Sequence, residues 1–217
     1  MNNKNVLETL KKLRQCSKKR NFRQTFDLIL NLKDLDLKKP DHQLDFFVTL
    51  HYSKGREVKV CALVGPELQD EGRKVCDETI TQDSFEKYHK DKKITKKLAE
   101  TFDFFIAQAN IMPKIASSFG TVFGPRGKMP NPKAGCIVPP KINLKPVYDK
   151  LQKTIRVKAK TVPLIQCAVG SEEMKDEEIS DNIMTIYNQV IHHLPGEKNN
   201  IKSIYLKLTM GKPEKVE

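Results

Sequence analysis

The chain has 217 residues and is strongly basic, with 39 Lys and Arg residues against 27 Asp and Glu residues and a formal net charge of +12. That length suits one large domain or two modest ones, and the positive surplus favours a polyanionic partner over small acidic substrates. Its five cysteines are widely separated with no CxxC pair, and its apolar runs fall short of the roughly 20 residues of a membrane helix, which argues against zinc sites, disulfide frameworks and membrane spans.

More than half of the positive surplus comes from the first 24 residues, where eight basic residues face Glu8 alone. Val6, Leu10 and Leu13 recur at helical spacing and predict a short amphipathic helix with a basic outer face. Such a face can also be merely solvated. Polar residues stand where a secretory signal would be apolar, so we expect the protein to remain in the cytosol.

Period-two patterns then predict strands. One face of the first strand is apolar, formed by Phe26, Leu28, Leu30 and Leu32, and residues 45–50 are its expected partner. Further strands at residues 58–64, which lead into Gly65-Pro66, and 104–107 alternate with helical patterns. This alternation predicts a small α/β layer structure with parallel strands.

Residues 120–140 contain four glycines and five prolines, which predicts an irregular loop. The loop does not match a nucleotide-binding motif, because Met129 follows Lys128 where a phosphate loop needs Ser or Thr, and GxGxxG is absent. No Ser, His and Asp set indicates a nucleophile. A small Rossmann-type enzyme therefore stays only as an alternative, and we expect no metal or cofactor.

The C-terminal third again alternates strand and helix patterns. A helix is predicted at residues 144–151, a hairpin from strands 154–158 and 164–169 with a turn near Pro163, and a helix that begins at the acidic residues 176–178. A last strand has a polar face that carries Ser203, Tyr205, Lys207 and Thr209. Because both ends of the chain have half-polar strands and flanking helices, we expect the two ends to form one α+β domain and the middle another.

Two basic groups favour RNA as the partner. The first is Arg20-Asn21-Phe22-Arg23, and the second comprises Lys150, Lys153, Arg156, Lys158 and Lys160. Lys and Arg contact phosphates, while an aromatic side chain such as Phe22 can stack on a base. The alternative for Phe22 is an ordinary core position.

Four stretches, in this order, resemble the motifs of one family: residues 20–25 (RNFRQT), 103–109 (DFFIAQA), 124–130 (GPRGKMP) and 207–211 (KLTMG). The chain is similar over nearly its entire length to the universal ribosomal protein L-one family. Its archaeal branch looks closest, although residues 209–213 are also similar to the eukaryotic ending.

The resemblance implies two domains. Domain I, residues 1–66 and 153–217, is a discontinuous α+β domain that binds ribosomal RNA, and domain II, residues 67–152, is an inserted, Rossmann-like three-layer α/β unit. The RNA-binding positions expected in domain I are Arg20, Phe22, Thr25, Lys158, Lys160, Ser203, Thr209, Met210 and Gly211. In domain II, Arg126, Lys128 and Lys133 are expected to make secondary contacts with RNA or tRNA, unless their loop is simply a rigid hinge-side loop.

The resemblance also implies the partners. They are the ribosomal RNA of the mobile stalk of the large subunit, the deacylated tRNA that leaves the nearby exit site and, as a hypothesis, the protein's own messenger RNA, whose translation it would repress. The protein is expected to be cytoplasmic, ribosome-associated and monomeric outside the ribosome. A ribosome-assembly factor with an L-one-like domain is the alternative, although such relatives usually lose the Thr-Met-Gly ending that is kept here.

Overall fold

The computed structural model describes residues 2–216 of the chain. The backbone divides into two compact units: unit 1 combines the N-terminal part up to Arg56 with the C-terminal part from Lys153, and unit 2 is Glu57–Gln152. The chain thus passes from unit 1 to unit 2 after Arg56, ten residues before the expected boundary at residue 66. The reason is that the strand at residues 60–64 pairs only with strands of unit 2.

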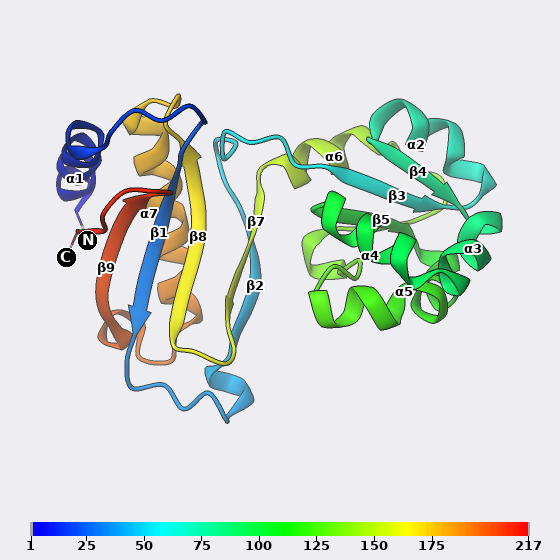
Figure 1. Ribbon diagram of the computed structural model, residues 1–217. Coiled ribbons are helices and arrows are strands. Elements are labelled where there is room, and N and C mark those ends of the chain that lie inside the picture. The colour runs from blue at the N-terminus through cyan, green and yellow to red at the C-terminus, as the bar shows by residue number, and fades with distance from the viewer. Residues whose placement is uncertain (1, 217) are drawn as a thin grey trace. The chain divides into compact units, whose positions relative to one another are not determined.

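A four-stranded antiparallel sheet forms the centre of unit 1 (Figure 1). Its order is β10 (Glu214–Lys215), β9 (Ile201–Leu208), β1 (Thr25–Leu32) and β8 (Leu164–Ser171). Alternate residues of β1 are fully buried, among them Phe26, Leu28 and Leu30. The first and last predicted strands are therefore confirmed, each with one apolar and one polar face.

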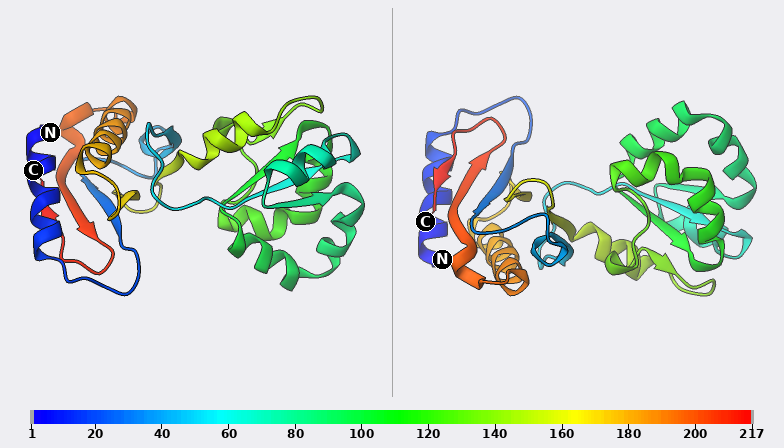
Figure 2. Two further views of the ribbon diagram at one scale, coloured as in Figure 1. Left: turned by 90° about the horizontal axis from the view of Figure 1, so that it is seen from above. Right: turned by 90° about the horizontal axis from the view of Figure 1, so that it is seen from below.

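Two helices complete the core of unit 1. α7 (Asp176–His193) begins with three acidic residues, as predicted, and buries Ile179, Ile183, Ile186 and Val190. α1 (Asn3–Cys16) buries Val6, Leu10 and Leu13 and runs beside β9 and the C-terminal segment (Figure 2). Because both helices lie on the apolar side of the sheet, its other face carries the polar side chains.

Two predicted strand pairings are wrong. β2 (Leu44–Thr49) pairs with β7 (Thr154–Ala159) in a separate two-stranded antiparallel sheet, and not with β1. β7 and β8 follow each other along the chain but belong to different sheets, so they form no hairpin ladder. The physical reason is that β8 and β9 already occupy both edges of β1, while period two identifies a buried face without identifying a neighbour.

Unit 2 contains a parallel sheet in the order β4 (Glu78–Thr81), β3 (Val60–Val64), β5 (Phe104–Gln108) and β6 (Ile137–Val138). One face of the sheet carries α2 (Gln69–Val75) and α6 (Lys145–Gln152), and the other carries α3 (Phe85–Lys90), α4 (Lys92–Thr101) and α5 (Met112–Arg126) (Figure 1). Short 3-10 turns lie at Pro40–His42, Pro66–Leu68, Gln82–Ser84, Ala109–Ile111, Pro132–Ala134 and Glu197–Asn200. The expected combination of an α+β and a Rossmann-like α/β architecture is confirmed.

The predicted loop at residues 120–140 is wrong in its first third, because α5 continues to Arg126. Phe119, Val122 and Phe123 lie on one face of α5 and are buried, with the Phe123 ring centroid 4.3 Å from that of Phe105 in β5. Burial of these side chains outweighs the low helix propensity of the glycines. The helix ends where Gly127 adopts a left-handed conformation, with φ of 64°.

Candidate nucleic-acid interface

The start of β1 and the end of β9 are joined by two threonines. The Thr25 amide donates to the Thr209 hydroxyl at 3.0 Å, and the two hydroxyl oxygens lie 3.0 Å apart. The Thr209 amide in turn donates to the Thr25 carbonyl at 3.1 Å. Residues far apart in the sequence therefore present two hydroxyl groups at fixed positions on the surface.

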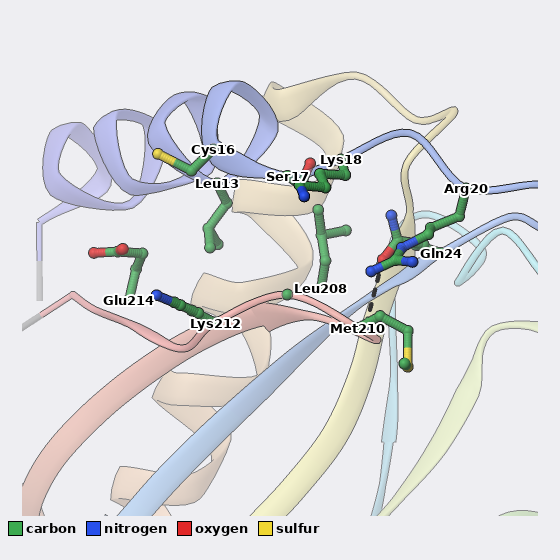
Figure 3. Close-up of a pocket in the computed structure, with 11 residues that line it drawn as sticks. Leu13, Cys16, Ser17, Lys18, Arg20, Gln24, Leu208, Met210, Lys212 and Glu214 are labelled. Carbon is green, nitrogen blue, oxygen red and sulfur yellow. Dashed lines mark hydrogen bonds between the residues drawn. The ribbon is translucent and has the colours of Figure 1, made fainter.

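Met210 and Gly211 form the turn that follows. The Met210 amide donates to the side-chain oxygen of Gln24 at 3.3 Å, and Gln24 is itself only 2% exposed. The Gly211 amide donates to the Leu208 carbonyl at 2.9 Å, and a Cβ atom at Gly211 would lie 3.2 Å from that of Leu208. With its backbone held in this way, Met210 has a side chain that is 62% exposed and points away from the core (Figure 3).

Phe22 is not a core residue. It is 50% exposed and lies in the segment between α1 and β1, two residues after Arg20. A half-exposed aromatic ring beside cationic groups suits stacking on an unpaired base. We call Arg20, Phe22, Thr25, Thr209, Met210 and Gly211 the strand-end site.

A pocket of about 600 Å³ adjoins this site (Figure 3). Its walls come from the end of α1, the segment that leads to β1, and the chain from Leu208 onwards. The lining residues are Leu13, Cys16, Ser17, Lys18, Arg20, Gln24, Leu208, Met210, Gly211, Lys212 and Glu214. The sequence patterns did not indicate Lys18, Gln24 or Lys212 as members of a common site.

Arg14 stabilises the backbone next to the strand-end site. Its guanidinium bonds Asp176 at 2.7 Å and donates to the carbonyls of Glu172 and Met174, and it lies 5.2 Å from the centroid of the Phe26 ring. The turn at residues 172–174, whose carbonyls Arg14 bonds, is connected to the site, because the Glu172 amide donates to the Gln24 carbonyl at 3.0 Å. Arg14 thus fixes the backbone next to Gln24.

The structure does not bring Ser203 to the strand-end site. Ser203 shares the polar face of β9 with Tyr205 and Lys207, but it lies six residues before Thr209, about 20 Å along an extended strand. Its hydroxyl accepts a hydrogen bond from the Asn31 side chain at 2.9 Å. Asp27 lies in β1 opposite Lys207 of β9. Burial raises the pKa of the Asp27 carboxyl, and the positive charge of Lys207 opposes this shift.

Lys158 and Lys160 also lie away from the strand-end site, beside the loop that leads into β8. Asp45 bonds Arg156 at 2.7 Å and Lys160 at 2.8 Å, and these cations lower the pKa of its carboxyl to about 2. Lys160 is therefore engaged in a local ion cluster, whereas Lys158 is exposed. Because the Pro163 carbonyl accepts from the Leu32 amide at 2.9 Å, this cluster lies at the end of the sheet that holds Ser203.

Two of the three candidates in unit 2 have internal partners. Arg126 bonds Glu100 and the Lys96 carbonyl, each at 3.0 Å, and Lys128 donates to the carbonyls of Phe102 and Asp103. Both side chains tie the end of α5 to α4 and to the start of β5, whereas Lys133 is exposed.

A cluster of lysines in unit 2 went unnoticed in the sequence patterns. We call it the lysine face. Its members are exposed residues of α3 and α4: Lys87, Lys90, Lys92, Lys93, Lys96 and Lys97. On α4 the lysines oppose the buried Thr95, Leu98 and Ala99. The signal in the sequence is the spacing of lysine pairs four residues apart, which places them on one side of a helix.

The position where doubly wound sheets usually bind nucleotides is filled in unit 2. That position is the carboxyl end of β3 and β5, where the strand order reverses. Here the side chain of Gln108 is buried and accepts from the Gly65 amide at 2.8 Å. Within residues 2–216 no group of three or more His, Cys, Asp or Glu side chains is arranged to hold a metal ion, and no helix is long and apolar enough to cross a membrane.

Comparison with known proteins identifies the family. The model of the ribosomal protein L1p/L10e family matches residues 10–212. The large ribosomal subunit protein uL1 of Methanothermococcus thermolithotrophicus is 41% identical over 217 residues, which cover 100% of both chains. The protein of the same name from Nanoarchaeum equitans is 42% identical over 209 residues, 94% of this chain and 96% of the relative, and that from Pyrococcus abyssi is 38% identical over 213 residues, 98% and 95% of the two chains. The chain therefore belongs to the ribosomal protein L1p/L10e family, in its archaeal type.

Proposed function

We propose that unit 1 binds ribosomal RNA of the large subunit through the strand-end site. The family and the relatives' names make the chain a structural, non-enzymatic constituent of the large ribosomal subunit. The observation that carries the RNA-binding proposal is the joined pair of Thr25 and Thr209 hydroxyls. The exposed Met210 follows Thr209, and the exposed Phe22 lies in the segment before Thr25. Such hydroxyls can bond the 2′-hydroxyls of RNA. The Phe22 ring offers a stacking surface for a base, and the Met210 side chain offers an apolar contact.

The RNA in this proposal is the mobile stalk near the tRNA exit site, where the protein would assist release of deacylated tRNA. Full-length similarity to proteins named as subunit components favours this role over that of an assembly factor. The protein acts in the cytoplasm on the ribosome and is a monomer outside it.

The test is the affinity for a short stalk fragment of ribosomal RNA at fixed salt, comparing wild type with Thr209→Ala and Met210→Ala. Loss of the Thr209 hydroxyl should cost about 1 kcal/mol, roughly a five-fold weaker Kd. Loss of the Met210 side chain, which the bound RNA would bury, should cost up to about 1.5–3 kcal/mol. Matched controls are Thr101→Ala and Ile142→Ala, both at exposed positions of unit 2 and outside the proposed RNA-contact residues. Weak binding that is indifferent to all four substitutions would remove the proposal.

Repression of the protein's own messenger is a further part of the proposal. Since one RNA-binding surface would serve both ligands, the messenger leader and the stalk fragment should compete. A gel shift with the messenger leader and unlabelled stalk fragment measures this, and the absence of competition would rule out a shared site.

For unit 2, we propose that secondary contacts with RNA or tRNA use Lys133 and the lysine face. Arg126 and Lys128 already have partners within the unit, whereas the lysine face combines several exposed cations. Phosphate contacts from such cations strengthen binding and increase its salt dependence. Lys93→Glu with Lys97→Glu should weaken binding to whole ribosomal particles lacking the protein, while the control pair Lys59→Glu with Lys114→Glu should not. Equal effects of the two pairs would indicate a response to net charge alone.

A further inference from the structure

We propose that the pocket between α1 and the end of β9 receives one unstacked nucleotide of the bound RNA, with its base inside and its phosphates at the rim. This inference rests on the proposed function, because the RNA must first engage the strand-end site. It extends that site by naming a second element of recognition, an extruded base rather than a surface contact.

The interior of the pocket suits a base. Leu13 and Leu208 are buried and form an apolar floor, and the exposed Met210 side chain stands at one edge (Figure 3). The volume of about 600 Å³ lies in the range of small-molecule sites, which are usually about 300–1,000 Å³. Met210 belongs to both the strand-end site and the pocket, so RNA bound at one lies next to the other.

The rim of the pocket suits phosphate. Lys18, Arg20 and Lys212 supply three positive charges against the single negative charge of Glu214. None of these four side chains forms an ion pair with another residue in the described part of the chain. These three cations bond no carboxylate within residues 2–216 and can neutralise phosphates of an RNA backbone.

The wall formed by α1 determines which way the nucleotide faces. The last carbonyls of a helix carry partial negative charge and repel phosphate, so the phosphates belong with the rim lysines. Glu214, which lines the pocket, can accept a hydrogen bond from a donor group on the edge of the base.

Cys16 provides a reporter inside the pocket wall. It is exposed, whereas Cys61, Cys76, Cys136 and Cys167 are buried. Burial raises the pKa of the Cys76 and Cys136 thiols to about 11 and that of Cys167 to about 12, and it also raises that of Cys61. Because the thiolate is the reactive form, alkylation of the folded chain should occur at Cys16.

The experiment measures the rate of Cys16 alkylation by iodoacetamide, with and without saturating stalk RNA, by mass spectrometry of the intact full chain. We expect the RNA to slow alkylation at least ten-fold. The affinity of two variants separates an occupied pocket from a merely covered one. Cys16→Trp should fill the pocket and weaken binding at least ten-fold, whereas Gln15→Trp, at an exposed position of α1 that does not line the pocket, should leave the affinity unchanged.

Two results would overturn the inference while the proposed function stands: RNA that binds with an unchanged alkylation rate, or a Cys16→Trp variant that binds as tightly as wild type. Thermal unfolding of Cys16→Trp checks that it is folded. If it is not folded, the Lys18→Ala and Lys212→Ala variants decide the question. Each should weaken binding and reduce the slope of log affinity against log salt concentration by about 0.7–0.9. The control Lys114→Ala should change neither the affinity nor the slope. Failure of the wild type to bind stalk RNA would instead overturn the proposed function and this inference together.

Discussion

At the scale of single residues, the most informative electrostatic feature is Asp45. Its pKa is lowered to about 2 because its carboxylate bonds Arg156 and Lys160. A carboxyl with a depressed pKa in the folded state binds its proton less tightly than in the unfolded chain. Its contribution to stability is therefore complete above the ordinary pKa of about 4 and is lost as the pH falls towards 2.

Asp45→Asn should accordingly lower the free energy of unfolding at pH 7 by about 1 kcal/mol, a modest value because the cluster is partly exposed. The difference from wild type should shrink between pH 4 and pH 2, as urea unfolding at several pH values would measure. Asp41→Asn, at an exposed position, is the control. A difference that stays constant over this range would show that Asp45 acts by packing rather than by charge.

Arg14 should tolerate no substitution, including Lys. One guanidinium bonds a carboxylate and two carbonyls at once, which an ammonium group cannot reproduce in the same plane. We expect Arg14→Lys and Arg14→Ala each to cost about 2 kcal/mol of unfolding free energy, by thermal or urea unfolding. An Arg14→Lys variant as stable as wild type would contradict this account.

At the scale of elements, the sequence predicted which face of a helix or strand is buried more reliably than which strands pair. The buried faces of α1, α7, β1 and β9 follow from apolar spacing, and the structure confirms them. The partners of β2 and β7 could not be predicted, because pairing depends on which edges other strands have already occupied. The strand-end site shows the same limit. Arg20 and Phe22 were singled out by the basic cluster and Thr209 by the polar face of its strand, while Thr25, Met210 and Gly211 were expected from the family resemblance. Neither periodicity nor composition indicated that Gln24 links β1 to Met210.

The α5 helix offers a direct test of the corrected loop assignment. An added Cβ at Gly120 would meet no atom within 4 Å, so Gly120→Ala should raise the free energy of unfolding by about 0.5–1 kcal/mol. Gly124→Ala should bring no such gain, although its surroundings are equally open, because Pro125 follows and disfavours helical backbone at the preceding residue. Urea unfolding of both variants measures this. Destabilisation by Gly120→Ala would contradict a continuous helix.

At the scale of the whole molecule, each unit has its own hydrophobic core. The larger cluster draws only on residues before 56 and after 153, and the other only on residues 61–123. A segment with its own core and short connections can fold alone. Residues 57–152, produced separately, should therefore give a cooperative thermal transition with an α/β circular dichroism spectrum. A featureless, uncooperative melt would mean that unit 2 needs unit 1 to fold.

Net charge and recognition make different predictions for the intact protein, and one measurement separates them. A chain with a net charge of +12 binds any RNA to some extent, and such binding weakens steeply with salt. The decisive quantity is the ratio of affinities for the stalk fragment and for an unrelated RNA of equal length at fixed salt, in wild type and in Met210→Ala. The strand-end site predicts a large ratio in wild type that falls markedly in the variant. Equal affinities for both RNAs in wild type would contradict specific recognition and leave only a generic basic protein.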